Sequence, residues 1–339
     1  MRIENDSVLV RLVRNVLGDR TEAAFDALVI PAELAEVTGD RVPRAVFAMA
    51  LATVLFDDLL ARVPSGARYV ADRRAAGGHI LFDHGALRTI RFPHGPTGAL
   101  PAGQDAFARI LEPLGYAVAS LYPLPALKMT GHAYCHRDLP EAIPQYFVSE
   151  LHVDRFDDVF AQAAARVFGT SIDPLTPADV AVLDGFARDG AVAYADAEPA
   201  LPRIAAAFDR QHGDVTVADY EALLAQSGEA AWIATEGNAF NHATDRVADV
   251  EALSDTLRDD GWPIKERVEI SASGRVRQTA FRADPVERLF LDADGQLVRR
   301  TVPGSFYEFI TRHAKDDGSL DLAFDSANAT GIFAMTRAA

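Results

Sequence analysis

Residues 82–88 read Phe82-Asp83-His84-Gly85-Ala86-Leu87-Arg88, so an imidazole stands four positions before a guanidinium. The same spacing returns at His242 and Arg246, in a second segment far along the chain. A strand turns successive side chains to opposite faces, so residues four apart share a face. The repeated spacing therefore indicates two related segments, each presenting a histidine and an arginine on one face of a strand.

A glutamate follows each histidine at the same distance. The interval from His84 to Glu150, 150 − 84 = 66, equals the interval from His242 to Glu308, 308 − 242 = 66. Two imidazoles and two carboxylates in matching positions predict a duplicated module that builds one metal site between its halves. A lone histidine in a strand is more often a buried structural residue, so this prediction depends on the repeat.

The pattern of secondary structure around these residues repeats as well. Apolar spacing predicts a strand at 80–92, a helix at 103–114 and strands at 117–122, 127–136 and 145–153. The second copy has a strand at 240–247, a helix at 250–258 and strands at 264–270 and 275–281. It continues through 289–291 and a turn at 292–295 to a closing strand at 305–311. Both copies follow the order βαβββ, so we predict an α+β fold in which two modules form one cupped mixed sheet.

The same patterns divide the chain into five segments. These are an N-terminal helical layer at 1–78, the first module at 79–153, a helical insertion at 154–236, the second module at 237–313 and a tail at 314–339. We expect the N-terminal helices to form a packing layer rather than a lid over the site. The tail is short and polar, and no site residue is predicted in it.

Composition and charge exclude several classes of protein. Apolar residues make up 49% and charged residues 24% of the 339 residues, which is typical of a soluble globular protein. The formal charge of −16 argues against nucleic acid and anionic membranes as partners. The longest apolar run, 45–56, is too short to span a bilayer. With one cysteine, Cys135, and an N-terminus that lacks a signal pattern, the sequence predicts a cytoplasmic protein without disulfides.

The residue types favour an oxygen-activating iron site. Two histidines and one carboxylate leave three neighbouring positions open on an octahedral ion, which suits Fe(II) that binds a bidentate substrate and dioxygen together. We predict that His84, His242 and Glu308 are the metal ligands. Glu150 and His132 are then predicted to be hydrogen-bonded neighbours of the site.

Two other functions stay open at this point. A metal isomerase or lyase of the glyoxalase type would use Glu150 as a fourth ligand and would favour zinc or nickel. A metal-free small-molecule-binding protein on the same scaffold would need no redox metal. Oxygen uptake distinguishes an iron dioxygenase from both.

The duplicated modules resemble the vicinal oxygen chelate superfamily. Within it, residues 83–88 are similar to the His-Gly-Ala-x-Arg signature of the 2-oxoadipate dioxygenase/decarboxylase family, also called hydroxyglutarate synthase. Residues 241–247 are similar to the run that carries the second histidine ligand, and Glu308 matches a glutamate late in the second module. Residues 132–138 are similar to a further family run, of which His132 and Arg137 are kept.

This resemblance implies a substrate and a reaction. In the family, Fe(II) and dioxygen convert 2-oxoadipate to 2-hydroxyglutarate with release of carbon dioxide, so the expected partners are a 2-oxo acid and dioxygen. Arg88 is expected to be the catalytic arginine that holds the substrate carboxylate. The other candidate substrate-binding residues are Arg246, Arg137 and Arg282. For Arg246 the favoured alternative is a structural ion pair with a neighbouring acid such as Asp83 or Asp245.

Overall fold

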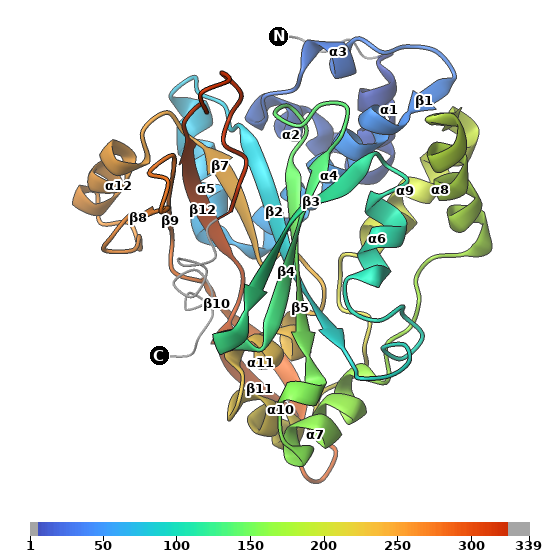
Figure 1. The fold of residues 1–339 in the computed structure, drawn as a ribbon, viewed down its shortest axis with the longest axis vertical. Coiled ribbons are helices and arrows are strands. Elements are labelled where there is room, and N and C mark those ends of the chain that lie inside the picture. Colours follow the sequence, from blue (N-terminus) through green and yellow to red (C-terminus); the bar gives the residue numbers. More distant parts are fainter. Residues whose placement is uncertain (1–5, 325–339) are drawn as a thin grey trace.

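The computed structural model describes residues 6–324, and a curled eight-stranded sheet lies at its centre (Figure 1). The strands follow the spatial order β3-β4-β5-β2-β7-β12-β9-β8. Their bounds are β2 Phe82–Arg91, β3 Tyr116–Leu124, β4 Met129–His136, β5 Gln145–His152, β7 His242–Arg246, β8 Glu269–Ile270, β9 Val276–Ala280 and β12 Phe306–Arg312.

The sheet is built from two halves that meet at β2 and β7. These two strands are antiparallel, whereas β5 runs parallel to β2 and β12 runs parallel to β7. In each half the first strand of the module lies at the seam, followed outward by the fourth, third and second strands. The predicted pair of βαβββ modules in one mixed sheet is therefore confirmed.

Two short sheets outside the main one were not fully predicted. Strands β10 (Pro285–Leu291) and β11 (Leu297–Pro303) form a hairpin, of which only 289–291 and the turn were expected. Most side chains of this hairpin alternate between exposed and half-buried, so its strands carry a weak apolar signal. Strands β1 (Arg41–Pro43) and β6 (Ala191–Ala193) pair although they are far apart in the sequence, and such short strands have no detectable period.

Helices cover the sheet and fill the insertion. The first five are α1 Val8–Leu17, α2 Thr21–Ala27, α3 Ala32–Ala35, α4 Arg44–Arg62 and α5 Pro64–Ala75, and α6 Asp105–Leu111 belongs to the first module. The insertion holds α7 Asp158–Phe168, α8 Pro177–Asp189, α9 Tyr194–Ala206, α10 Val217–Leu224 and α11 Gly228–Glu236, and the second module adds α12 Val250–Asp259. Short 3-10 turns are η1 Gly18–Arg20, η2 Pro125–Leu127 and η3 Val153–Arg155.

The N-terminal helices form the predicted packing layer. Helix α4 is apolar over most of its surface and buried from Val46 to Phe56, as expected for a helix in a core. On α5, the Tyr69 ring lies 5.5 Å from Tyr307 and 4.8 Å from Phe309 of β12. Side chains alternate along a strand, so these helices contact the face of β12 opposite to Glu308. No helix among residues 6–324 is long and apolar enough to cross a membrane.

Candidate metal centre

Three predicted ligands meet at the seam of the sheet. Oε2 of Glu308 lies 3.3 Å from Nε2 of His84 and 3.2 Å from Nε2 of His242. Their three ligand atoms all lie within 4.8 Å of one another. The strand register explains this meeting, because Thr244 of β7 stands opposite His84 on one side and opposite Glu308 on the other. All three ligands are buried.

Each imidazole is oriented by its neighbour in the sequence. Nδ1 of His84 lies 2.8 Å from Oδ1 of Asp83, and Nδ1 of His242 lies 3.0 Å from Oδ1 of Asn241. A carboxylate can only accept a hydrogen bond, so the Nδ1–H of His84 donates to Asp83. With Nδ1 held by Asp83, Nε2 is the nitrogen that faces Glu308 and is left to bind a metal, which is the arrangement that histidine ligands adopt around metals.

The donor set and its spacing fit a divalent metal ion. Ligands ~2.0–2.2 Å from an ion lie about 3 Å apart when their bonds are at right angles. The observed separations of 3.2 and 3.3 Å come close to that value. The Thr244 hydroxyl donates to Oε2 of Glu308 over 2.6 Å and holds the carboxylate in place.

The charges of Glu308 and His242 suit this role, whereas His84 must first lose a proton. Burial lowers the pKa of His84, but its hydrogen bonds with Asp83 and Glu308 outweigh burial and raise that pKa, so a metal ion must displace a proton there. Burial raises the pKa of Glu308, but His242 and His84 outweigh that effect and keep the pKa well below its usual range. Burial lowers the pKa of His242 and so favours the neutral imidazole. An ionised carboxylate and a neutral imidazole are the forms that bind metals.

Asp83 has a central role in the site that the sequence did not reveal. A bulge lies between Phe82 and His84, and the carboxylate of Asp83 is fully buried. Arg312 of β12 donates to both carboxylate oxygens at 2.9 Å, and Nε of Arg246 donates to Oδ2 at 2.6 Å. Arg246 was a candidate substrate-binding residue, and the structure instead places it in the ion pair with Asp83 that was its structural alternative. The sequence indicated Asp83 only as a candidate ion-pair partner of an arginine, and its contact with the His84 imidazole was not predicted.

Arg88 lies on the same face of β2 as His84, four residues further along. Its side chain is 1% exposed, and its guanidinium lies 5.0 Å from the ring centre of Trp232 on α11. Its backbone carbonyl accepts a hydrogen bond from Asn238 at 2.7 Å. The structure therefore places a buried positive charge on the strand face that carries the metal ligands.

Glu150 does not lie near the metal ligands, so its predicted role is wrong. Glu150 stands opposite Thr89, and the side chain of Thr89 points away from the sheet face that carries His84 and Arg88. Glu150 therefore points to that other face of the sheet. There its Oε2 accepts hydrogen bonds from the backbone N–H of Gln104 at 2.9 Å and from Nε of Arg91 at 2.6 Å.

The two glutamates are equivalent in sequence spacing but not in structure. In the second module, Glu308 stands opposite Thr244, which is two residues after His242. In the first module, the residue two after His84 is Ala86, and the residue opposite it is Phe147. The fourth ligand of a glyoxalase-type site is therefore absent from the residues that the structure describes, because a phenylalanine takes its place. The matching sequence interval arose because the segments between the strands differ in length.

Three other predicted site residues lie elsewhere. His132 stands opposite Val148, which puts it on the same face as Glu150. Arg137 donates to the carbonyls of Gly115 and Glu112 at 3.3 and 3.4 Å, beyond the end of β4. Arg282 follows β9 and its side chain is exposed. None of these three positions supports a role beside the metal ligands.

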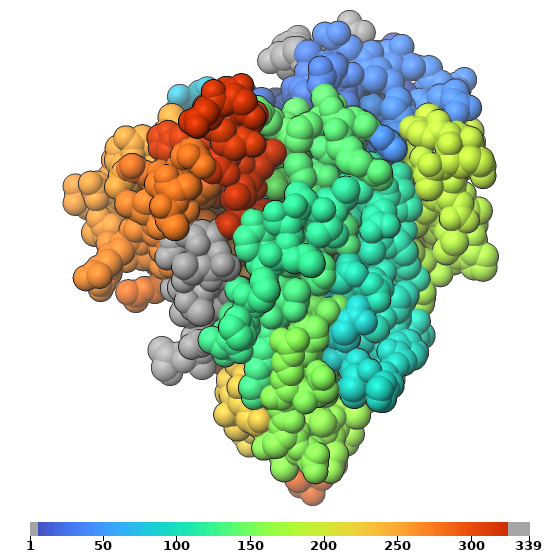
Figure 2. Space-filling model, in the orientation of Figure 1, coloured from blue at the N-terminus to red at the C-terminus, as the bar shows by residue number. Residues whose placement is uncertain are grey.

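The C-terminal segment contributes to the site, contrary to the prediction. Nη1 of Arg312 donates to the carbonyls of Asp321 and Ala323 at 2.9 and 2.8 Å. The ring of Phe324 lies 4.8 Å from that of His84 and 4.9 Å from that of Phe147. Figure 2 shows the end of the described chain, in red, between the two modules. Phe324 belongs to neither copy of the repeat, so the sequence pattern carried no signal that predicted this contact.

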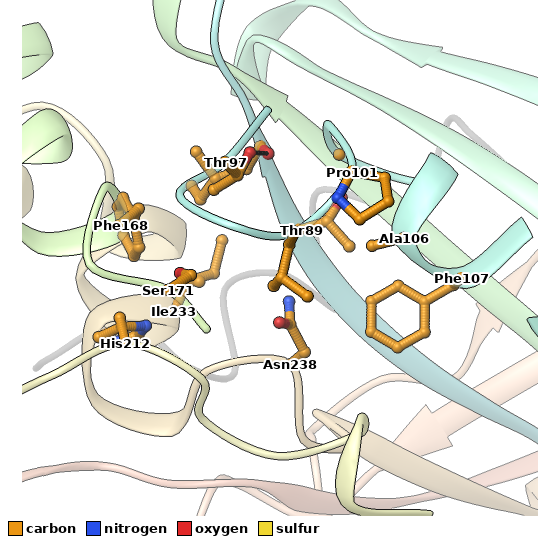
Figure 3. A pocket seen from close by; sticks show the side chains of 13 residues that line it. Thr89, Thr97, Pro101, Ala106, Phe107, Phe168, Ser171, His212, Ile233 and Asn238 are labelled. Carbon is orange, nitrogen blue, oxygen red and sulfur yellow. Dashed lines mark hydrogen bonds between the residues drawn. The ribbon is translucent and has the colours of Figure 1, made fainter. Parts of the chain in front are cut away.

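A small cavity lies on the other face of β2 (Figure 3). Its volume is about 20 Å³, enough for about one water molecule. Thr89, Asn238 and His212 are among the residues that line it. The His212 ring faces the carbonyl of Ala234 at 2.9 Å, and burial lowers its pKa to about 4. The size of this cavity excludes it as the site of an organic substrate.

A curled sheet of two βαβββ halves, with a triad of ligands at the seam, defines the vicinal oxygen chelate class of proteins. Within that class the chain belongs to the 2-oxoadipate dioxygenase/decarboxylase family, whose sequence model matches residues 32–322.

Curated relatives carry the same family name. The chloroplastic/amyloplastic 2-oxoadipate dioxygenase/decarboxylase of Oryza sativa is 23% identical over an alignment of 294 positions, gaps included, and the alignment covers 77% of this chain and 70% of the rice protein. The 2-oxoadipate dioxygenase/decarboxylase of Mycobacterium tuberculosis H37Rv is 27% identical over 223 residues. That alignment covers 62% of this chain and about half, 52%, of the mycobacterial protein.

Solved structures agree with the fold. A crystal structure from Ralstonia eutropha JMP134, with the provisional name of a glyoxalase superfamily protein, is 50% identical and superimposes with a TM-score of 0.89. The match covers 94% of this chain and 98% of that one. Hydroxyglutarate synthase from Oryza sativa, solved with 2-oxoadipate, gives a TM-score of 0.67 at 20% identity over 92% of this chain and 95% of that one. At that identity the likeness shows the fold.

Proposed function

We propose that this protein is an Fe(II)-dependent dioxygenase/decarboxylase that acts on a 2-oxo acid, with 2-oxoadipate converted to 2-hydroxyglutarate and carbon dioxide. The observation that carries the proposal is the triad of two histidines and one glutamate with Phe147 in the position of a fourth ligand. Three protein ligands leave room on an octahedral ion for a bidentate substrate and dioxygen. The names of the curated relatives and the 2-oxoadipate complex of the rice protein support the same substrate class.

Fe(II) would supply a binding site for the 2-oxo acid and the electrons that activate dioxygen. His84, His242 and Glu308 would hold it. Asp83 and Asn241 fix the orientation of the two imidazoles through their Nδ1 atoms. The rings of Phe324 and Phe306 lie against those of His84 and His242, and Phe147 lies against Phe324. An apolar border of this kind strengthens electrostatic interactions at a site from which water is displaced.

Arg88 is the group in our proposal that binds the far carboxylate of the substrate. It shares the strand face of His84, and the Cα atoms of these residues are about 13 Å apart for an extended strand. The long arginine side chain and a small dicarboxylic acid together can span that separation. A guanidinium binds a carboxylate in a forked geometry, each charge-assisted bond contributing ~1.5–3 kcal/mol. The chain carries a charge of −16, so a buried cation is needed to attract an anionic substrate.

The test is oxygen consumption after anaerobic loading with Fe(II). We expect the loaded protein to consume one dioxygen for each carbon dioxide released and each hydroxy acid formed, without an added co-substrate. A series of 2-oxo acids of graded chain length should show the highest kcat/KM for a dicarboxylic acid. The Glu308→Ala protein is the matched negative control. Isomerase activity with zinc or nickel, together with no oxygen uptake with Fe(II), would contradict the proposal.

A further inference from the structure

An aromatic cluster lies beside the metal ligands. The ring of Phe324 is 4.8 Å from His84, 4.9 Å from Phe147 and 6.1 Å from Tyr122. The rings of Tyr122 and Phe147 are 5.8 Å apart, so the three form one contiguous surface. Because Phe324 contacts the ring of a metal ligand, this surface borders the space in which a substrate would meet the metal.

Several contacts fix the cluster in place. The backbone N–H of Phe324 donates to the Tyr122 hydroxyl over 2.9 Å, and Arg312 holds the carbonyls of Asp321 and Ala323. A Cβ atom on Gly131 of β4 would lie 2.3 Å from the Phe147 ring, so glycine at that position is what allows the ring to lie against the strand. The cluster is therefore a preformed wall rather than a set of loose side chains.

The wall follows the path from the metal ligands to Arg88. Ala86 lies between His84 and Arg88 on the same strand face, and Phe147 is its partner on β5. Ala86 is buried and packs in one apolar cluster with Phe147 and Phe324, so these side chains cover the strand face between His84 and Arg88. A 2-oxo acid held at both ends would place its methylene groups against these two rings.

We propose that Phe324 is a specificity-determining residue, which together with Phe147 forms the apolar wall that selects the chain length of the 2-oxo acid. This inference rests on the proposed function. It adds a role for a residue of the C-terminal segment, which lies far from His84 in the sequence and outside both modules. An apolar wall of fixed position contacts methylene groups favourably and excludes a longer or bulkier chain.

The test compares 2-oxoglutarate, 2-oxoadipate and 2-oxopimelate with Phe324→Ala, Phe324→Trp and unaltered protein. In Phe324→Ala we expect the kcat/KM ratio of 2-oxopimelate to 2-oxoadipate to rise by about 10-fold or more, since one methylene in an apolar pocket typically changes selectivity about 10–200-fold. Phe324→Trp should shift the preference toward 2-oxoglutarate. Phe156→Ala is the matched control, because Phe156 is a half-buried aromatic residue stacked on Phe160 of α7. It should leave the ratios unchanged within about twofold.

A binding measurement separates this inference from the proposed function. Dissociation constants of the three acids are measured by calorimetry on anaerobic protein loaded with Co(II), and metal content is determined for each variant. Altered chain-length ranking with unaltered metal content supports the role of Phe324. Binding with the same ranking in all variants overturns that role alone. If the unaltered protein binds none of the acids and consumes no oxygen, the proposed function fails, and the inference fails with it.

Discussion

Replacing Asp83 with asparagine is expected to weaken both the fold and the metal site. The Asp83 carboxylate is fully buried, receives two hydrogen bonds from Arg312 and one from Arg246, and accepts the Nδ1–H of His84. Burial raises the pKa of Asp83, but Arg312, the hydrogen bond from His84, and Arg246 outweigh it and hold the pKa well below its usual value. The group is therefore charged at neutral pH, and its charge is what the two arginines require.

The expected loss of stability follows from the burial of the pair. The side chains of Arg312 and Asp83 are both 0% exposed, and removal of one partner from a buried pair typically costs ~3–5 kcal/mol. Asp173→Asn is the matched control, since Asp173 also forms two hydrogen bonds with one arginine, Arg109. Those side chains are 28% and 25% exposed, so its loss should cost only about 1 kcal/mol.

The expected loss of metal affinity follows from the orientation of His84. Partners that orient a histidine ligand typically contribute about 10–100-fold to metal affinity. Denaturant unfolding of metal-free protein measures the loss of stability, and a competition titration with Co(II) measures affinity separately. The reasoning is refuted if Asp83→Asn costs no more stability than Asp173→Asn and binds Co(II) with unaltered affinity.

Three further predictions concern single side chains. Glu308→Ala should abolish Fe(II) binding and oxygen uptake, whereas Glu150→Gln should retain its metal. Metal analysis of both purified proteins checks this prediction, and loss of metal in both would mean that Glu150 also binds the metal. Arg88→Met should retain iron but lose ~2–5 kcal/mol in kcat/KM for dicarboxylic 2-oxo acids and much less for monocarboxylic ones; equal losses would mean a structural role. Burial raises the pKa of Asp245 to about 6, although hydrogen bonds from Tyr69 and from the backbone N–H of Leu81 lower it. The folded protein therefore binds the proton of Asp245 more tightly than the unfolded chain does. Stability should therefore fall by about 3 kcal/mol as pH rises from about 3 to about 7, and Asp245→Asn should remove this slope in denaturant unfolding. A slope that persists in Asp245→Asn would assign it to other groups.

The sequence predicted the parts of the site that belong to the repeat. His84 and His242 were identifiable because duplication placed a histidine at matching positions of β2 and β7. Glu308 was identified from the repeated interval and the family resemblance, although Phe147 takes its place in the first module. Glu150 was misassigned because a sequence interval does not define a strand register. Gln145 stands opposite His84 and Phe306 opposite His242, so the interval between paired positions is shorter in the first module than in the second.

The remaining site residues act through contacts that no sequence period encodes. Asp83 reaches its partners because of a bulge, and a bulge shifts the alternation of side chains locally. Arg312 and Phe324 come from the end of the second module and the segment after it, and neither belongs to a repeated motif. Their roles depend on long-range packing against β2, so the structure was needed to find them.

The position of the triad at the seam has a consequence for assembly of the protein. Its ligands come from β2, β7 and β12, and the first of them belongs to a different module from the other two. Neither half of the sheet alone holds a complete set of ligands, so an ion can be bound tightly only after both halves have docked. Such an ion stabilises the chain in which both halves of the sheet are docked, and it does not stabilise the separated halves. This stabilisation increases with the ratio of the ion concentration to the dissociation constant of the ion. Metal supply would thus set the lifetime of the assembled protein against unfolding and proteolysis.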